Sequence, residues 1–245
     1  MLREILRVRI GSYCHGTNNE KSDQDIRSIC IPPIQMYFGL NSWDENVRKE
    51  NGNDFEEWNI KKLFNLLVKG NPSAMNILFV NKKDIFNCDS LGLRLLQNKD
   101  IFLSKRIINS CVGYAVSQIQ KIEIGRGTKE GNRSAIIEEF GYDVKFMYHA
   151  IMMLNMAIEL IKHGRYSPLR PEPEQRFLKD IRLGKVTLEE ARAVFKSNLE
   201  TINVIESMCK LQEKPDEKVV EDLLVDILTE HFNEDRSCNT YLQKT

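Results

Sequence analysis

The sequence predicts an α+β protein, in which a small sheet near the N-terminus is followed by a mostly helical region. Segments rich in β-branched and alternating apolar residues occur only in the first third of the chain, whereas helical spacing of apolar residues dominates from about residue 60 onward. The 245 residues suffice for one large domain or two small ones. We therefore expect a sheet with its helices over residues 1–82, and a helical domain over residues 83–245 that packs against it and closes a cleft.

Three short strands are expected first, each with β-branched or alternating residues: 5–10, 23–31 and 54–58. The first strand leads into a tight turn at Gly11-Ser12. Pro32-Pro33 ends the second, because proline cannot donate a hydrogen bond to the ladder. Residues 41–53 are charged and contain a glycine, so we expect a solvent loop there.

The remaining elements are predicted to be helices. Asn59 is a suitable N-cap for a helix over residues 60–68, which has one apolar face, and Gly70-Asn71-Pro72 ends it. Helical spacing then predicts helices at 73–79, 91–98, 104–124, 135–140, 142–163, 172–183, 187–208 and 218–232.

Composition excludes several classes of protein. The 35 Lys and Arg residues balance 35 Asp and Glu residues, and 42% of the chain is hydrophobic, as in ordinary globular proteins. With a net charge of zero, any nucleic acid would have to bind a local basic patch. The six cysteines form no CxxC pair and have no histidine at zinc-finger spacing, which argues against a zinc cage and a disulfide framework.

The sequence also argues against secretion and membrane insertion. Apolar and charged residues are interleaved over residues 1–10, unlike the continuous apolar core of a signal peptide. The most apolar stretch, 146–161, is interrupted by polar residues and is shorter than the ~20 residues that cross a bilayer, so we expect a buried helix. The expected location is the cytoplasm, or the host-cell cytoplasm if the protein is viral. The oligomeric state stays open.

The sharpest chemical feature is the pair Asp23 and Asp25. Side chains two apart on a strand point to one face, which places their Cα atoms about 7 Å apart. Two carboxylates this close need a counter-charge, which two Mg²⁺ or Mn²⁺ ions ~3.5–4 Å apart supply in phosphoryl transfer. The alternative interpretation is a solvated turn at the start of a strand.

Gly11 and Ser12 lie ten residues before this pair. Gly11 allows the backbone to approach a phosphate closely, and Ser12 adds a hydroxyl donor. Arg27 falls on the strand face of the two aspartates, where it could pair with a phosphate or orient Asp25.

A basic loop offers a possible contact for nucleic acid. Residues 125–134 are rich in glycine and polar residues and separate two expected helices. Their Arg126, Lys129 and Arg133 could bind a nucleic-acid backbone, since phosphate contacts need only positive charge and reach. Ordinary solvated side chains explain these residues almost as well.

The spacing of Gly-Ser, ten residues and Asp-x-Asp resembles the nucleotidyltransferase signature of the DNA polymerase beta superfamily. The longer string GSYCHGTNNEKSDQDIR over residues 11–27 resembles the RlaP-type family of predicted nucleotidyltransferases associated with RNA repair. Later segments match that family in the same order, among them 70–72, 103–105, 140–145 and 181–184, so the resemblance covers about residues 8–230.

The resemblance implies a minimal nucleotidyltransferase sheet and a third carboxylate on the strand after the loop. Asp54 is preferred, because the family carries an aspartate there, and Glu56 on the same strand face is the alternative. With Asp23 and Asp25, Asp54 would hold the two metal ions, and it would help the acceptor hydroxyl lose its proton. Lys145 and His149, one helical turn apart, would face the nucleotide together with Gly11, Ser12 and Arg27; a core position for His149 is the alternative.

The reaction implied by the family is transfer of a nucleoside monophosphate from an NTP to an acceptor hydroxyl, with an RNA (or DNA) 3′ end as the suggested acceptor. Two alternatives remain: a protein hydroxyl, as in antitoxins of the superfamily that place AMP on a toxin, and a catalytically silent binding module. The base of the NTP stays open. The family usually has a glutamate at the position of Asn76 and an arginine at that of Met152, which would alter specificity if either residue touches the substrate.

Overall fold

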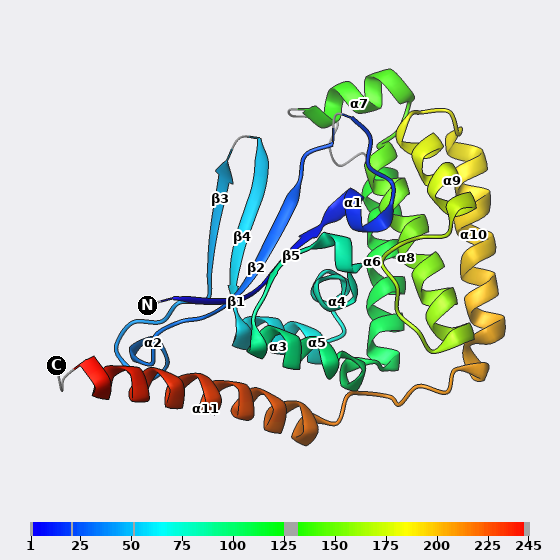
Figure 1. Cartoon of the computed structure of the whole chain (residues 1–245). Coiled ribbons are helices and arrows are strands. Elements are labelled where there is room, and N and C mark those ends of the chain that lie inside the picture. Colours follow the sequence, from blue (N-terminus) through cyan, green and yellow to red (C-terminus); the bar gives the residue numbers. More distant parts are fainter. Residues whose placement is uncertain (1, 21, 51, 125–131, 243–245) are drawn as a thin grey trace.

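The computed structural model describes residues 2–20, 22–50, 52–124 and 132–242. A five-stranded mixed sheet lies on one side of the molecule and a group of long helices on the other (Figure 1), which confirms the α+β class. In sheet order the strands are β3 (Glu45–Glu50), β4 (Asn53–Asn59), β2 (Asp25–Ile31), β1 (Arg3–Ile10) and β5 (Ile85–Cys88).

The sheet brings three strand ends together at one edge. β2 pairs antiparallel with β1 and parallel with β4. The last residue of β1, Ile10, is therefore the Cα partner of Asp25 at the start of β2, and Asp25 is in turn the partner of Asp54 near the start of β4. Residues that the sequence separates by up to 44 positions thus form one row across the sheet.

Two strands lie where the sequence did not predict them. β3 occupies the expected solvent loop, because a charged segment can still pair as an edge strand, and Val47 within it remains 63% exposed. β5 is only four residues long and pairs with β1 across a register shift. Neither segment has the alternating or β-branched pattern that identified the other three strands.

Short helices surround the sheet, and the expected turn at Gly11-Ser12 is one of them. They are α1 (Gly11–His15), α2 (Gln35–Phe38), α3 (Ile60–Val68), α4 (Pro72–Phe79) and α5 (Ser90–Gln97), with 3-10 turns at Lys82–Asp84 and Lys99–Phe102. Asn59 and Asn71 cap α3 and α4 by accepting from Lys61 N and Ala74 N. Asn59 was predicted in this role from the sequence.

The helical region contains the longer helices; most lie close to the predicted ranges, but the last one, predicted over 218–232, extends to Leu242. They are α6 (Lys105–Glu123), α7 (Asn132–Phe140), α8 (Val144–His163), α9 (Glu172–Arg182), α10 (Leu188–Ile205), with a 3-10 turn at Glu206–Met208, and α11 (Glu217–Leu242). α8 packs against α6, α9 and α10 and contains most of the buried methionines. By length and composition α8 is apolar enough to cross a membrane, but most of it is buried inside the protein, as expected for a core helix.

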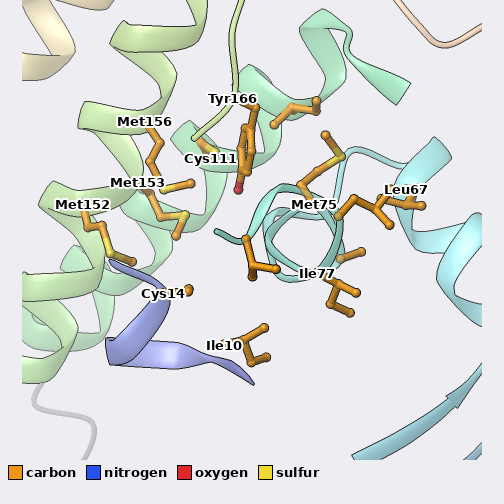
Figure 2. Close-up of a cluster of buried hydrophobic side chains, with 14 of the residues drawn as sticks. Ile10, Cys14, Leu67, Met75, Ile77, Cys111, Met152, Met153, Met156 and Tyr166 are labelled. Carbon is orange, nitrogen blue, oxygen red and sulfur yellow. The ribbon is translucent and has the colours of Figure 1, made fainter. Parts of the chain in front are cut away.

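One core connects the sheet side to the helical side. Figure 2 shows Met152, Met153 and Met156 of α8 directed toward the side on which Cys14 of α1 and Tyr166 lie. Tyr166 donates from its hydroxyl to Asn76 Oδ1, 2.9 Å away on α4. The position of α1 is therefore tied to the helical region by packing.

The last helix returns to the sheet side of the molecule. α11 packs along α3 and α5 (Figure 1), and Arg94 of α5 pairs with Asp226 at 3.0 Å and with Glu230 at 2.7 Å. Thus β5 and α11 both belong spatially with the sheet although they follow residue 82 in sequence. The division into 1–82 and 83–245 remains a prediction.

Candidate active site

The site begins where β1 runs into α1. Gly11 has φ +67°, a left-handed conformation that glycine adopts without strain. A Cβ placed on Gly11 would lie 1.8 Å from Asp25 Oδ2, so the carboxylate occupies the space that any other side chain would need. Glycine is therefore required here both by the backbone conformation and by the space available. The second reason shows that the Asp25 carboxylate lies directly over the backbone of residue 11.

Three aspartates lie near this point. Asp25 starts β2 and is half-buried, whereas Asp23 lies just before the strand and is exposed. The parallel register pairs Asp25 with Asp54 on β4. Asp54 also forms an ion pair with Lys49 of β3, whose Nζ lies 3.0 Å from Asp54 Oδ1. The register thus favours Asp54 over Glu56 as the residue beside Asp25.

Asp25 is surrounded by negative charge from the neighbouring carboxylates of Asp23 and Asp54. Burial raises its pKa above the ordinary value, and the charges of Asp23 and Asp54 raise the pKa further. Among the described residues, no group of three or more His, Cys, Asp or Glu side chains is already close enough to enclose a metal ion. The aspartates therefore form a repelling group and not a finished metal cage.

A cavity of about 230 Å³ lies over Asp23 and Asp25, whereas Asp54 does not line it. Its walls combine the acids with the turn of α1 and with side chains from two helices of the helical region. The lining residues are Gly11, Ser12, His15, Asp23, Asp25, Lys145, Tyr148, His149 and Arg182. Lys145 and His149 of α8 thus line the same cavity as Asp23 and Asp25, and their contact with a nucleotide stays a prediction.

Tyr148 and Arg182 also line the cavity, although neither was predicted as a site residue; Arg182 lies in the segment 181–184 that resembles the RlaP-type family. The Tyr148 hydroxyl lies 2.7 Å from Thr17 Oγ1, and Arg182 donates to the Thr17 carbonyl at 3.1 Å. The Arg182 guanidinium also stands 5.4 Å from the centre of the Tyr148 ring. Together they attach the loop that carries Asp23 to α8 and α9. Because the partners are 131 and 165 residues apart, no local pattern could have revealed these contacts.

His15 forms the buried back wall of the site. Its Nδ1 donates to the Pro168 carbonyl at 2.9 Å, which fixes the orientation of the ring. Burial is the main cause that lowers the pKa of His15 to about 4. In the sequence His15 is a lone histidine near a turn, which is only weak evidence for a functional role.

Arg27 and Glu56 lie on the same sheet face as Asp25 and Asp54 but do not line the cavity. They form an ion pair, and Arg27 stacks over the Trp58 ring at 4.2 Å. Trp58 Nε1 donates to Glu56 at 3.0 Å. Burial lowers the pKa of Arg27 to about 10. In this arrangement Arg27 is engaged with Glu56 and Trp58 and is placed to influence Asp25 from beside it.

The predicted basic loop cannot be placed. Arg126 and Lys129 lie outside the described residues, and of Arg133 only the backbone, within α7, is described. Their proposed contact with nucleic acid stays a prediction.

A second cavity, of about 210 Å³, adjoins the first. Both are lined by Gly11, His15 and His149. The second also contains Asn76 and Met152, so the two positions at which the sequence departs from the RlaP-type pattern meet in one place beside the aspartates.

Comparison with known proteins decides the family. A model of the RNA repair pathway DNA polymerase beta family, RlaP, matches residues 2–225. The chain belongs to this family. It is therefore a nucleotidyltransferase of the DNA polymerase beta superfamily, as the sequence resemblance predicted.

Solved structures and curated proteins were compared with the chain as well. Among solved structures, a nucleotidyltransferase-like protein from Exiguobacterium sibiricum 255-15 is similar, with 13% identity and a TM-score of 0.31, over 94% of this chain and 74% of that chain. We base no conclusion about the site on this likeness. Among curated proteins, none matches the chain.

Proposed function

We propose that this nucleotidyltransferase transfers a nucleoside monophosphate from an NTP to the 3′-hydroxyl of an RNA end and releases pyrophosphate. One observation carries the proposal: a single cavity combines Asp23 and Asp25 with two cationic side chains, Lys145 and Arg182. Catalysis of phosphoryl transfer depends mainly on positioning the reactants and on stabilising the charge of the phosphates. A cavity with both carboxylates and cations can do both. The RNA acceptor is supported by the description of the family as part of an RNA repair pathway.

The carboxylates fit the divalent ions that this chemistry uses. Mg²⁺ prefers hard oxygen ligands and is bound in phosphoryl-transfer sites by one or two carboxylates together with substrate phosphates. A site without a finished three-ligand cluster is compatible with that mode, and the repulsion that raises the pKa of Asp25 favours a cation there. When bound, Mg²⁺ or Mn²⁺ would neutralise charge on the phosphates.

The residues of the chain divide the remaining tasks. Ser12, Lys145 and Arg182 would hold the triphosphate, since all three line the cavity on the side of α1, α8 and α9. The carboxylate of Asp54 would accept the proton of the acceptor hydroxyl. Asp54 is the β4 neighbour of Asp25, and its side chain is partly exposed, so an acceptor can reach it. Lys49, now paired with Asp54, would release it as the acceptor enters.

The decisive experiment offers labelled NTPs with Mg²⁺ to the full chain in the presence of RNA, DNA and candidate protein acceptors in parallel. We expect label on RNA 3′ ends and none on RNA with a blocked 3′-hydroxyl. Label on protein alone would replace the RNA acceptor by a protein hydroxyl.

Nucleotide binding is tested separately by thermal unfolding. An NTP at 100 times its dissociation constant should stabilise the protein by about 2.7 kcal/mol, and EDTA should remove most of that gain. If none of the four NTPs stabilises the protein with Mg²⁺ or Mn²⁺, the chain is a silent module and the proposed function is wrong.

A further inference from the structure

The second cavity is the most distinctive feature that the proposed function does not use. It adjoins the aspartate cavity but differs from it in chemistry. The described residues that line it include no lysine, arginine, aspartate or glutamate. Its floor is apolar, formed by Ile10, Met152 and Met153, which are all buried. No cationic side chain among the described lining residues would neutralise a phosphate here, so the cavity suits a neutral ligand better.

An aromatic wall stands at the cavity. Tyr114 of α6 and His149 of α8 both line it and meet edge to face, with ring centres 6.5 Å apart. Tyr114 is 42% exposed, so part of its ring is accessible to a ligand. An exposed aromatic face beside an apolar floor is the arrangement on which nucleobases stack.

The carboxamide of Asn76 is one of the polar groups of this cavity, which His15, Asn71 and Ser73 also line. Asn76 is buried, and its Oδ1 accepts from the Tyr166 hydroxyl, which does not line the cavity. Among the described residues, no hydrogen-bond acceptor is found for the Asn76 Nδ2. The Asn76 NH₂ is not among the buried polar atoms of the described chain that lack a partner, and the residue lines the cavity, so this group can donate to an acceptor atom on the edge of a base. Cavities for drug-sized ligands measure about 300–1,000 Å³, so about 210 Å³ suits a smaller flat group.

The sheet order indicates which base would occupy the cavity. Asp25 lies on β2, between β1 and β4. Ile10, which lines the second cavity, is the β1 neighbour of Asp25, and Asp54, the candidate base for the acceptor hydroxyl, is its β4 neighbour. The acceptor and the second cavity are therefore on opposite flanks of Asp25. A nucleotide whose phosphates lie in the aspartate cavity can reach the second cavity past Gly11, which both cavities share.

We infer that the second cavity binds the nucleobase of the NTP, with Tyr114 as the stacking residue and Asn76 as the donor that distinguishes bases. This inference rests on the proposed function, since it assumes that the triphosphate lies over the aspartates. It goes further in separating a charged phosphate cavity from a neutral base cavity.

The test compares an NTP with Mg²⁺-tripolyphosphate, which has the phosphates but no base. We expect Tyr114→Ala to weaken NTP binding about 10-fold, because loss of one stacking ring typically has an effect of this size. Its affinity for tripolyphosphate should stay within 2-fold of the parent, roughly the scatter of distant substitutions. Tyr114→Phe, which keeps the ring, should bind both ligands like the parent. Equal loss for NTP and tripolyphosphate, or no loss for either, would overturn the inference.

Asn76→Asp tests the donor. The replacement keeps an oxygen to accept from Tyr166 but removes the NH₂ group, so the order of affinities among the four NTPs should change. An unchanged order would exclude Asn76 from base recognition. Failure of the parent to bind any NTP while it binds tripolyphosphate would overturn the base cavity, whereas failure to bind either ligand would show that the proposed function itself is wrong.

Discussion

The carboxylate of Asp25 rests on the backbone of Gly11, at the position where a Cβ of residue 11 would have to be. This contact joins the end of β1 to the start of β2, and it fixes the principal acid of the site against the turn that is proposed to hold phosphate. Any side chain at position 11 would displace one of the two.

We expect Gly11→Ala to abolish nucleotidyl transfer and to lower the free energy of unfolding. The left-handed backbone alone costs an alanine about 1–2 kcal/mol, and the Cβ must also push Asp25 away. Transfer assays and urea unfolding measure the two effects. Gly164→Ala is a matched control, because Gly164 has φ +62° and nothing lies within 4 Å of an added Cβ. In this control the free energy of unfolding should fall by a similar backbone contribution, and the transfer rate should be unchanged. Retained transfer in Gly11→Ala would contradict the placement of Asp25.

Asp25→Asn should abolish transfer and stabilise the metal-free protein at neutral pH. The folded state raises the pKa of Asp25, so ionisation of this carboxyl opposes folding. Below the ordinary value of 3.8 both states are protonated and the penalty is absent; it grows as the pH rises through the raised pKa. Thermal unfolding of parent and variant at pH 3 and pH 7 checks this. A gain at pH 3 that is as large as at pH 7 would refute the electrostatic cause.

The two candidates for the third carboxylate should respond differently to neutral replacement. We expect Asp54→Asn to lower kcat by about 10²-fold or more with little change in stability, because its ion-pair partner Lys49 is exposed. Glu56→Gln should chiefly reduce stability, by about 1–3 kcal/mol, because it weakens the contact that neutralises the buried Arg27. Steady-state kinetics and urea unfolding distinguish them. The reverse pattern would make Glu56, and not Asp54, the carboxylate that accepts the proton.

His15 should make the protein sensitive to acid between pH 6.5 and about 4. The unfolded chain takes up a proton near the ordinary pKa of 6.5, but the buried ring does so only near 4, so stability is full above pH 6.5 and falls as the pH drops through this window. The largest loss is about 3 kcal/mol. His15→Asn keeps an N–H donor for Pro168 without the titration, so unfolding free energies of parent and variant should converge toward pH 4. Parallel pH curves would show that His15 does not titrate as described.

Much of the site was predictable because its acids and glycine follow local rules. Gly11, Asp23 and Asp25 lie within 15 residues, so a local pattern groups them. The predicted strand alternation does not place Asp23, because β2 begins at Asp25, but both aspartates line the same cavity. The neighbouring position of Asp54 required the strand register, which the sequence left open by two residues and the parallel pairing of β2 with β4 settles.

Other parts depend on contacts that no local pattern encodes. Arg182 enters the site because α9 packs on α8, and in sequence it is an ordinary basic residue near the end of a helix. β3 escaped detection because its residues are charged on both faces, which an edge strand tolerates. The second cavity arises only where α4, α6 and α8 meet.

The return of α11 to the sheet has a consequence for how the protein is made. Arg3 at the start of β1 pairs with Glu234 of α11 at 2.6 Å, and Leu223 and Ile227 of α11 are buried on that side. During translation β1 leaves the ribosome first and α11 much later, so the nascent sheet waits for its cover while more than 200 residues are synthesised. The last strand of the sheet, β5, ends at Cys88, so the sheet can form long before α11 is made. Packing of α11 on α3, α5 and the start of β1 closes a long loop and is therefore expected as a late step of folding.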